Sequence, residues 1–433
     1  MPTPPTPQAA KSASSEATPV NVSQDEIATA WRESGERWER LLASLIHRRQ
    51  AREEQQAERR SQHAPKPRAT EGRTLTLAGY GAGLHVDRGQ LVCQHGTIHS
   101  EQEPGREVLA RAVHGVGTIV WLTNGGSGNM SLAALHWCAE QNVTVVLLRS
   151  NGKHLATIHP DPDAPAALGT PNQNSGRTDI TVRRRQYEAL WSGRDVALAR
   201  SIVRRKIAGQ HATALRHTEL PDQKRALDAT SQALTWLDLE TAPPFLSTVD
   251  GVRLLEARAA RGYFRGWQGL PLNVERTARE RWPAHWLTVS ERNSPLSRYA
   301  NPRRAANPAQ AALNFVYGVL EGQVRQSLHA YGFDLAVAFL HADSQGRESL
   351  VYDVMEPCRG AVDDLFLKLL GSHTFMAGDF QVRTDGSVSI HPALLRALVE
   401  LCRLPQSRVD DIARWLRSQL LVMNESHDWH RPK

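Results

Sequence analysis

Cysteine is scarce in this chain. Its 433 residues include four cysteines, at Cys93, Cys138, Cys358 and Cys402. None of them belongs to a CxxC pair. This scatter excludes a disulfide framework and a cysteine-rich zinc site, because both need paired or closely spaced thiols. The cysteines instead indicate reduced thiols in an intracellular protein.

Long apolar runs are missing as well. Residues 143–148 form one of the longest, and a membrane span needs about 20 apolar residues. The first residues do not have the pattern of a secretory signal peptide. The sequence therefore predicts a soluble, cytoplasmic protein with no membrane partner.

The chain also lacks a strong excess of one charge. Lys and Arg total 52 and Asp and Glu total 45, which gives a formal net charge of +7. This balance is compatible with a polyanionic partner such as nucleic acid but does not require one. The length and a hydrophobic content of 40% are sufficient for two or three folded domains.

Composition and periodicity divide the chain into segments. A capping box at Ser23 and Glu26 precedes apolar residues at helical spacing. That helix has a single apolar stripe, which favours docking or a coiled coil over catalysis. We predict a disordered tail (1–22), a helical arm (23–70), a strand-rich N-terminal domain (74–157), a linker (158–180), a helical domain with the candidate catalytic residues (181–403), and a C-terminal helix and tail (404–433).

The predicted fold class is α+β with two domains. Alternating and β-branched runs indicate strands between residues 74 and 157, with a hairpin that turns at Asp87-Arg88. An amphipathic helix is expected at 131–140. From residue 181 onward the pattern is mostly helical, and the short apolar run at 336–341 fits either a strand or the start of a buried helix.

The first candidate for chemistry is Glu256, in a predicted helix. It shares a face with apolar and aromatic residues that include Tyr263. A carboxylate there is costly to bury unless it is paired or binds a cation. The simpler alternative is a surface ion pair with Arg253 or Arg261. The other face of this helix carries arginines that suit either DNA phosphates or solvent, namely Arg258, Arg261 and Arg265.

Two further candidates lie downstream. His341 ends an apolar run, where a histidine is more often structural than a ligand. Asp353 and Glu356 precede Pro357, and proline is well tolerated in the first turn of a helix. Capping of that helix by one of the two acids is therefore a serious alternative to metal binding.

Together, two carboxylates and one imidazole can hold Mg²⁺ or Mn²⁺ and leave positions open for water and phosphate. Such a cation would polarise a phosphodiester. No Ser-His-Asp or catalytic cysteine pattern competes. A basic helical region adds possible phosphate contacts, although a solvated helix face explains it equally well; its residues are Arg183, Arg184, Arg185, Arg204, Arg205 and Lys206.

Several motifs together resemble a known family. They are the run 256–264, Asn307-Pro308 with the helix through Asn314, Phe315 and Tyr317, the triplet 339–341, the segment 353–357, and the stretch 131–148 with Gly152. The family is the CRISPR-associated integrase and endonuclease, the first-numbered Cas protein. The resemblance covers residues 74–402.

The resemblance implies a metal site at Glu256, His341 and Glu356, with Asp353 and Tyr263 as neighbouring residues that support it. It implies a homodimer, double-stranded DNA as substrate and a complex with a dimer of the small second-numbered Cas protein. The implied reaction inserts short duplexes into a CRISPR array. In it, a 3′-hydroxyl attacks a phosphodiester at the repeat boundary.

Some features depart from the family pattern. The arm at 1–70 is unusual, Ala257 replaces a frequent glycine, and Gly360 replaces a common proline. The tail at 427–430 could be a second metal site, although a surface tail is the simpler interpretation. Two alternatives stay open: an integrase of a mobile genetic element related to the family, and a non-catalytic DNA-binding scaffold.

Overall fold

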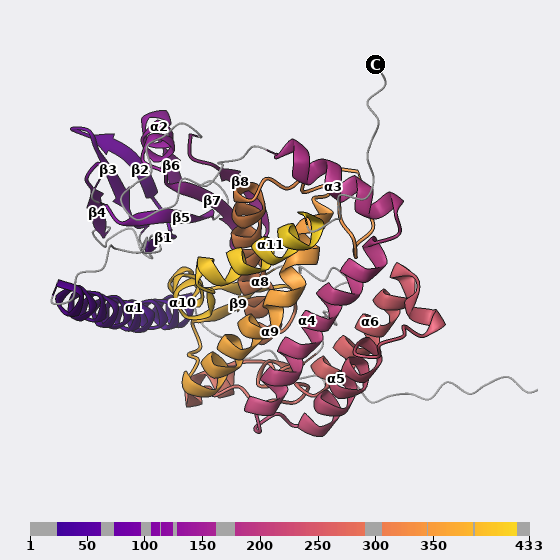
Figure 1. The fold of residues 1–433 in the computed structure, drawn as a ribbon. Coiled ribbons are helices and arrows are strands. Elements are labelled where there is room, and N and C mark those ends of the chain that lie inside the picture. Colours follow the sequence, from indigo (N-terminus) through magenta and orange to yellow (C-terminus); the bar gives the residue numbers. More distant parts are fainter. Residues whose placement is uncertain are drawn as a thin grey trace, which may run out of the picture.

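The structure is a computed structural model that describes residues 24–61, 73–96, 105–112, 114–123, 128–161, 178–290, 305–343, 345–383 and 386–421. Most strands lie on one side of the molecule and most helices on the other (Figure 1). This arrangement confirms the predicted α+β fold class. The possible metal site at 427–430 and the tail at 1–22 lie outside the described residues.

Two four-stranded sheets form the N-terminal domain. The first has the order β1-β5-β7-β8 and the second the order β4-β3-β2-β6. In the first sheet β1, β5 and β7 are parallel and β8 is antiparallel to β7. The bounds are β1 Arg73–Leu77, β2 Ala82–Asp87, β3 Gln90–Gln94, β4 Arg106–Leu109, β5 Val116–Thr123, β6 Gly128–Met130, β7 Thr144–Arg149 and β8 His154–Ile158.

The predicted hairpin is β2–β3, and its turn lies one residue later than expected. Asp87 pairs with Gln90, so Arg88 and Gly89 form a two-residue turn. Both have positive φ angles, 48° and 80°. Such turns match the right-handed twist of the strands they connect.

The first sheet is buried on both faces. Ile119 and Trp121 of β5 face the second sheet and the helix α2 (Leu132–Glu140), whereas Val120 and Leu122 join the core of the helical domain. Alternate side chains of a strand point to opposite faces, so one strand supplies both cores. Burial on both faces explains the continuous apolar runs in β5 and β7.

The helical domain is built around α8. Asn307 caps this helix and Pro308 is its first residue, as the sequence predicted, and nearly all of its side chains are buried. The other elements pack around it and along one another. Their bounds are α3 Ile180–Trp191, α4 Asp195–Arg216, α5 Gln223–Leu237, η1 Pro244–Leu246, α6 Val249–Arg265, α7 Arg276–Arg281, η2 Ala284–Trp286, α8 Pro308–Ala330, α9 Ser349–Ser372, β9 Phe380–Val382, β10 Val388–Ile390, α10 Pro392–Cys402 and α11 Gln406–Leu421.

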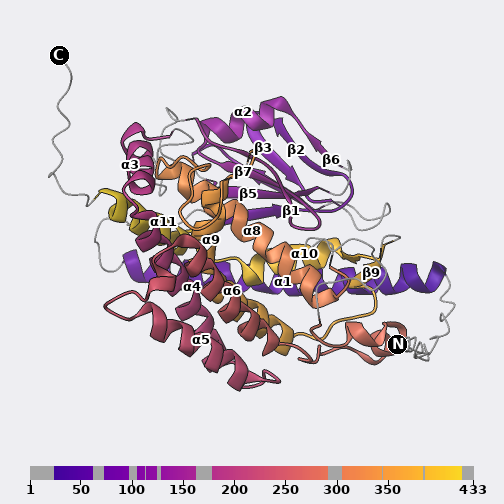
Figure 2. The ribbon, with the colours of Figure 1, turned by 90° about the vertical axis from the view of Figure 1, so that its right-hand side faces the viewer.

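The N-terminal arm is the helix α1 (Gln24–Ser61), which runs as a long rod beside α10 (Figure 2). Trp38 is fully buried in the core of the helical domain. Its indole nitrogen donates to Asp379 at 2.8 Å, and the Ser34 hydroxyl donates to the same carboxylate. The arm therefore docks within the chain, which agrees with one of the two interpretations of its single apolar stripe.

Two local predictions were wrong. The run at 336–341 is neither strand nor helix but a buried irregular segment. Pro357 is not in a first turn, because α9 already begins at Ser349 and contains this proline in its interior. Glu356 and Asp353 are therefore not helix caps. None of the helices in the described part of the chain combines the length and the apolarity that a membrane span requires.

Candidate active site

Three helices bring charged side chains together at one point. Lys206 comes from α4, Glu256 from α6 and Glu356 from α9. The Lys206 ammonium contacts Oε1 of Glu256 and lies 2.5 Å from Oε2 of Glu356. The two glutamates, 100 positions apart in the sequence, therefore share one cation.

A close approach of two helices at Gly360 makes this meeting possible. A Cβ on Gly360 of α9 would lie 2.4 Å from the backbone carbon of Gly209 in α4. The two helices touch through their backbones here, and Thr213 of α4 donates to the Gly360 carbonyl at 2.7 Å. Lys206 and Glu356 lie about one turn away from this contact. The glycine at 360, a departure from the family pattern, is thus a packing requirement of this chain.

Glu356 is buried and surrounded by basic groups. Its side chain is 5% exposed, and Arg359 lies 3.2 Å from Oε1. Burial alone would raise the pKa of this carboxyl, but Arg359 and Lys206 outweigh burial and lower the pKa to about 2. Glu356 is therefore a carboxylate throughout the physiological pH range.

His341 is held in place by Asp353. The Nδ1 atom of His341 lies 2.7 Å from Oδ1 of Asp353, which also accepts from the His341 backbone N–H. The other oxygen of Asp353 accepts from the backbone N–H groups of Phe339 and Leu340. This fully buried carboxylate thus fixes the irregular segment and leaves Nε2 of His341 for another partner.

The surface ion pair considered for Glu256 does not form with Arg253. Arg253 instead pairs with Asp250 at 2.7 Å and donates to the carbonyl of Leu340. That bond ties α6 to the segment that carries His341. Glu256 and His341 remain partly open, with side-chain exposures of 21% and 28%, so the accessible side of the site lies at these two residues.

The structure separates the predicted DNA-contacting residues into two groups. Arg184, Arg258, Arg261 and Arg265 are exposed, and Arg183 is exposed but pairs with Asp334. The expectation that Lys206 lies on an exposed basic face is wrong, because it is 4% exposed. It points into the helix bundle because the α4 face at Ile202, Lys206 and Gln210 packs inward.

Tyr263, predicted to support the metal site, contacts a different acid. Its hydroxyl donates to Asp363 at 3.1 Å, and Tyr317 donates to the other oxygen of Asp363 at 2.5 Å. Burial raises the pKa of the Asp363 carboxyl to about 6. Arg359, which pairs with Glu356, also stacks over the Tyr317 ring at 4.8 Å, so this network borders the Glu256–Glu356 site.

The residues present fit a divalent cation in their chemistry. Oε2 of Glu356 is buried and, despite its ion pair with Lys206, accepts no hydrogen bond in good geometry. Within the described ranges, no three acids, histidines or cysteines already stand at metal-binding distances. The ammonium of Lys206 occupies the space between the two glutamates, so the carboxylates must rearrange around a metal ion.

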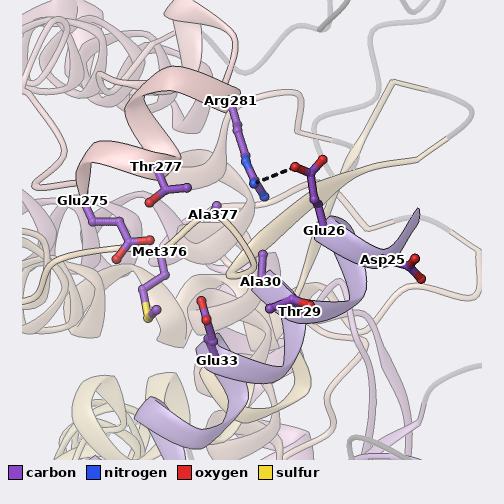
Figure 3. A pocket seen from close by; sticks show the side chains of 10 residues that line it. All are labelled: Asp25, Glu26, Thr29, Ala30, Glu33, Glu275, Thr277, Arg281, Met376 and Ala377. Carbon is purple, nitrogen blue, oxygen red and sulfur yellow. Dashed lines mark ion pairs between the residues drawn. The ribbon is translucent and has the colours of Figure 1, made fainter. Parts of the chain in front are cut away.

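The cavity shown in Figure 3 lies elsewhere, where the arm meets α7. It measures about 430 Å³ and is lined by Asp25, Glu26, Glu33, Glu275 and Arg281 among others. Glu26 and Arg281 approach to 4.0 Å across it. It contains none of the three predicted metal-binding residues, so it is a feature of arm docking.

The sequence profile described as "CRISPR associated protein Cas1" matches residues 75–403. The chain belongs to this family. The resemblance predicted from the motifs is confirmed, and the match stops short of the arm.

Curated relatives carry the same family name. The CRISPR-associated endonuclease Cas1 2 of Rhodospirillum rubrum is 28% identical over 322 residues, which are 72% of this chain and 80% of the relative. The CRISPR-associated endonuclease Cas1 1 of Pyrobaculum aerophilum is 31% identical over 261 residues, or 60% and 72% of the two chains. These relatives are endonucleases by name, which supports a nuclease activity for this member of the Cas1 family.

Solved structures share the fold. A casposase bound to its integration product matches with a TM-score of 0.61 and 22% identity, over 83% of this chain and 94% of that one. A Cas1 protein from Thermotoga maritima matches with a TM-score of 0.55 and 15% identity, over 81% and 97%. At these identities the likeness concerns the fold.

Sequence reasoning missed two groups at the site. Arg359 was not singled out, although an arginine three residues after Glu356 in a helix lies on the same face. The inward role of Lys206 was hidden because it closes a run of basic residues, Arg204, Arg205 and Lys206, that looks like a surface. The inward phase of its apolar neighbours Val203 and Ile207 was the available signal.

Proposed function

We propose that this protein joins the 3′ ends of short DNA duplexes to a CRISPR array by transesterification at a Mg²⁺ or Mn²⁺ site formed by Glu256, His341 and Glu356. The observation that carries this proposal is that Glu256 and Glu356 both contact the Lys206 ammonium group. The bound metal would supply charge neutralisation at the attacked phosphodiester and at its leaving oxygen.

The chain's own residues set the geometry. Asp353 binds Nδ1 of His341 and leaves Nε2 for the metal, while Lys206 and Arg359 keep Glu356 ionised. The Gly209–Gly360 contact holds α4 and α9 at a fixed separation. Transfer of a phosphoryl group depends on such positioning more than on a covalent nucleophile.

DNA would bind along the exposed side of α6. Arg258, Arg261 and Arg265 project from the helix that bears Glu256, and the exposed Arg183 and Arg184 lie on α3. Guanidinium groups hold phosphates without reading bases. We further propose a homodimer that works with the small Cas2 protein, since a Cas6-RT-Cas1–Cas2 complex shares this fold with a TM-score of 0.56 and 18% identity.

A strand-transfer assay tests the proposal. A short duplex with free 3′-hydroxyl groups is mixed with a supercoiled plasmid that bears a candidate repeat, with Mn²⁺ or Mg²⁺ and the Cas2 partner. Wild type should form covalently joined products, and Glu256→Gln and His341→Ala should reduce them at least about 10³-fold, as expected for loss of a metal ligand. Gln232→Ala in α5 is the control.

The outcomes separate three functions. Products that persist in Glu256→Gln or His341→Ala contradict the metal site. DNA binding without metal-dependent products in wild type supports a scaffold. Equal insertion into plasmids with and without the repeat supports a mobile-element integrase, the activity suggested by the casposase fold match. A separate helix-turn-helix at the C-terminus would also support the mobile-element alternative. In the described part of this chain, α10 and α11 instead pack against α8.

A further inference from the structure

Lys206 occupies an unusual position for a lysine. Its side chain is 5% exposed, and both carboxylates that it contacts belong to the proposed metal site. Buried lysines are rare unless paired, and here the pairing is double. The lysine is therefore not a spare basic residue but one that the three-helix junction is built to enclose.

The four side chains in direct ion-pair contact at the junction carry no net formal charge. Glu256 and Glu356 contribute two negative groups, and Lys206 and Arg359 contribute two positive ones. A divalent cation placed beside the two carboxylates adds two positive charges to this balanced set. A divalent cation ~5 Å from the ammonium group is repelled by it. This repulsion weakens cation binding roughly tenfold even with the dielectric constant of bulk water.

We infer that Lys206 is a counter-cation of the metal site: it competes with the divalent cation for Glu256 and Glu356 and thereby makes metal loading depend on bound DNA. This inference rests on the proposed metal site. Phosphates of a bound duplex bring negative charge to the open side of the junction, at Glu256 and His341. There they attract the Lys206 ammonium away from the two carboxylates and free these for the metal.

The coupling between metal binding and DNA binding is expected to be positive. In wild type, DNA tightens metal binding, and by linkage the metal tightens DNA binding by the same factor. Without the ammonium group, the DNA-free protein binds metal more tightly, and the additional gain from DNA shrinks. Free protein with Lys206 therefore binds the metal more weakly than DNA-bound protein does, which restrains the nuclease until a substrate is present.

Binding of Mn²⁺ to the full-length chain tests this inference. Free Mn²⁺ is measured by electron paramagnetic resonance, with and without a duplex whose 3′ ends are dideoxy-terminated and cannot react. Mn²⁺ held by DNA alone is subtracted. Lys206→Gln should bind Mn²⁺ roughly tenfold more tightly than wild type without DNA, and DNA should change its affinity less than it changes that of wild type.

Matched variants separate the explanations. Lys224→Gln removes the same charge from an exposed position on α5 and should behave like wild type. Lys206→Arg keeps the positive charge and should keep the weak DNA-free affinity. If Lys206→Gln unfolds, Lys206→Met takes its place, because it also removes the charge and keeps an unbranched side chain, and it should show the same gain in Mn²⁺ affinity. Tight DNA-free binding by Lys206→Arg would contradict the inference in either case.

Two results would overturn the inference in distinguishable ways. If Lys206→Gln folds and binds Mn²⁺ no more tightly than wild type without DNA, Lys206 does not compete with the metal. If neither wild type nor Lys206→Gln has an Mn²⁺ site that Glu256→Gln removes, with or without DNA, the proposed metal site itself is wrong.

Discussion

Glu356 at the helix junction and Asp379 at the docked arm are both buried acids, yet their environments have opposite effects. Glu356 faces two cations, which lower its pKa to about 2 against the effect of burial. Asp379 faces neutral donors from Ser34, Trp38 and Met376, and burial raises its pKa to about 6. A carboxylate flanked by cations stays ionised and can exchange one cation for another, whereas one held by neutral donors fixes a contact.

The two regions therefore divide the work of the molecule. The junction of α4, α6 and α9 holds ionised carboxylates next to cationic side chains. The contact of α1 with α10 and the 376–379 segment contributes packing and hydrogen bonds. Changes at the arm should affect stability first, and changes at the junction should affect activity first.

The largest expected stability effect is at the arm. Trp38→Ala removes a fully buried indole and its bond to Asp379, and should lower the free energy of unfolding by about 3–5 kcal/mol. Chemical denaturation measures this, with exposed Arg40→Ala on the same helix as control. A change below about 1 kcal/mol would show that the arm is not part of the core.

Asp353→Asn should lower both stability and strand-transfer activity. Asp353 accepts from three backbone N–H groups and from His341. In Asp353→Asn, the amide NH2 group replaces one accepting oxygen and faces two of these donors. We expect a loss of about 1–3 kcal/mol and a 10–100-fold drop in strand transfer. The exposed Asp228→Asn on α5 is the control; full activity in Asp353→Asn would remove Asp353 from any role in orienting His341.

Gly360→Ala tests the close approach of α4 and α9. The added Cβ meets backbone at 2.4 Å, so the helices must separate, at about 1–3 kcal/mol. Gly371→Ala lies in the same helix with nothing within 4 Å and should be neutral or up to about 1 kcal/mol stabilising. Strand transfer should fall only in Gly360→Ala. Equal behaviour of the two variants would contradict the role of the glycine contact.

The smallest expected effects are slopes of stability against pH, at most about 1.4 kcal/mol per pH unit for one group. The folded pKa of Glu356 is below the ordinary 4.5, so its contribution is complete above pH 4.5 and is lost as the pH falls toward 2. The folded pKa of Asp379 is above 3.8, so its contribution is lost as the pH rises from about 4 to 6.

Two variants should each reduce one slope. Glu356→Gln should reduce the slope of the acid limb below pH 4.5. Asp379→Asn should reduce the slope from pH 4 to 6, and part of that slope should remain because the pKa of buried Asp363 is also about 6. Denaturant titrations at several pH values measure both. A slope that is unchanged in the matching variant would assign the titration to another group.

Local patterns predicted much of the fold. The helices expected at 131–140 and after Asn307-Pro308 are present as α2 and α8, because helical periodicity is a local property of the sequence. The strands β5 and β7 also appear where β-branched runs predicted them. Pro357 misled the prediction because the tightly packed α9 accommodates a proline in its interior, where isolated helices are destabilised by one.

For the predicted site, the residue types followed from the sequence, but their electrostatic surroundings did not. The sequence alone determined which residue types could form it, since two acids and one histidine in the family's motifs specify hard-metal chemistry. Only the tertiary structure decided how these residues are compensated. Lys206, 50 positions before Glu256 and 150 before Glu356, reaches both because Gly360 lets α9 touch the backbone of α4. Electrostatic balance at a buried site depends on distances in space, and local sequence patterns do not encode those.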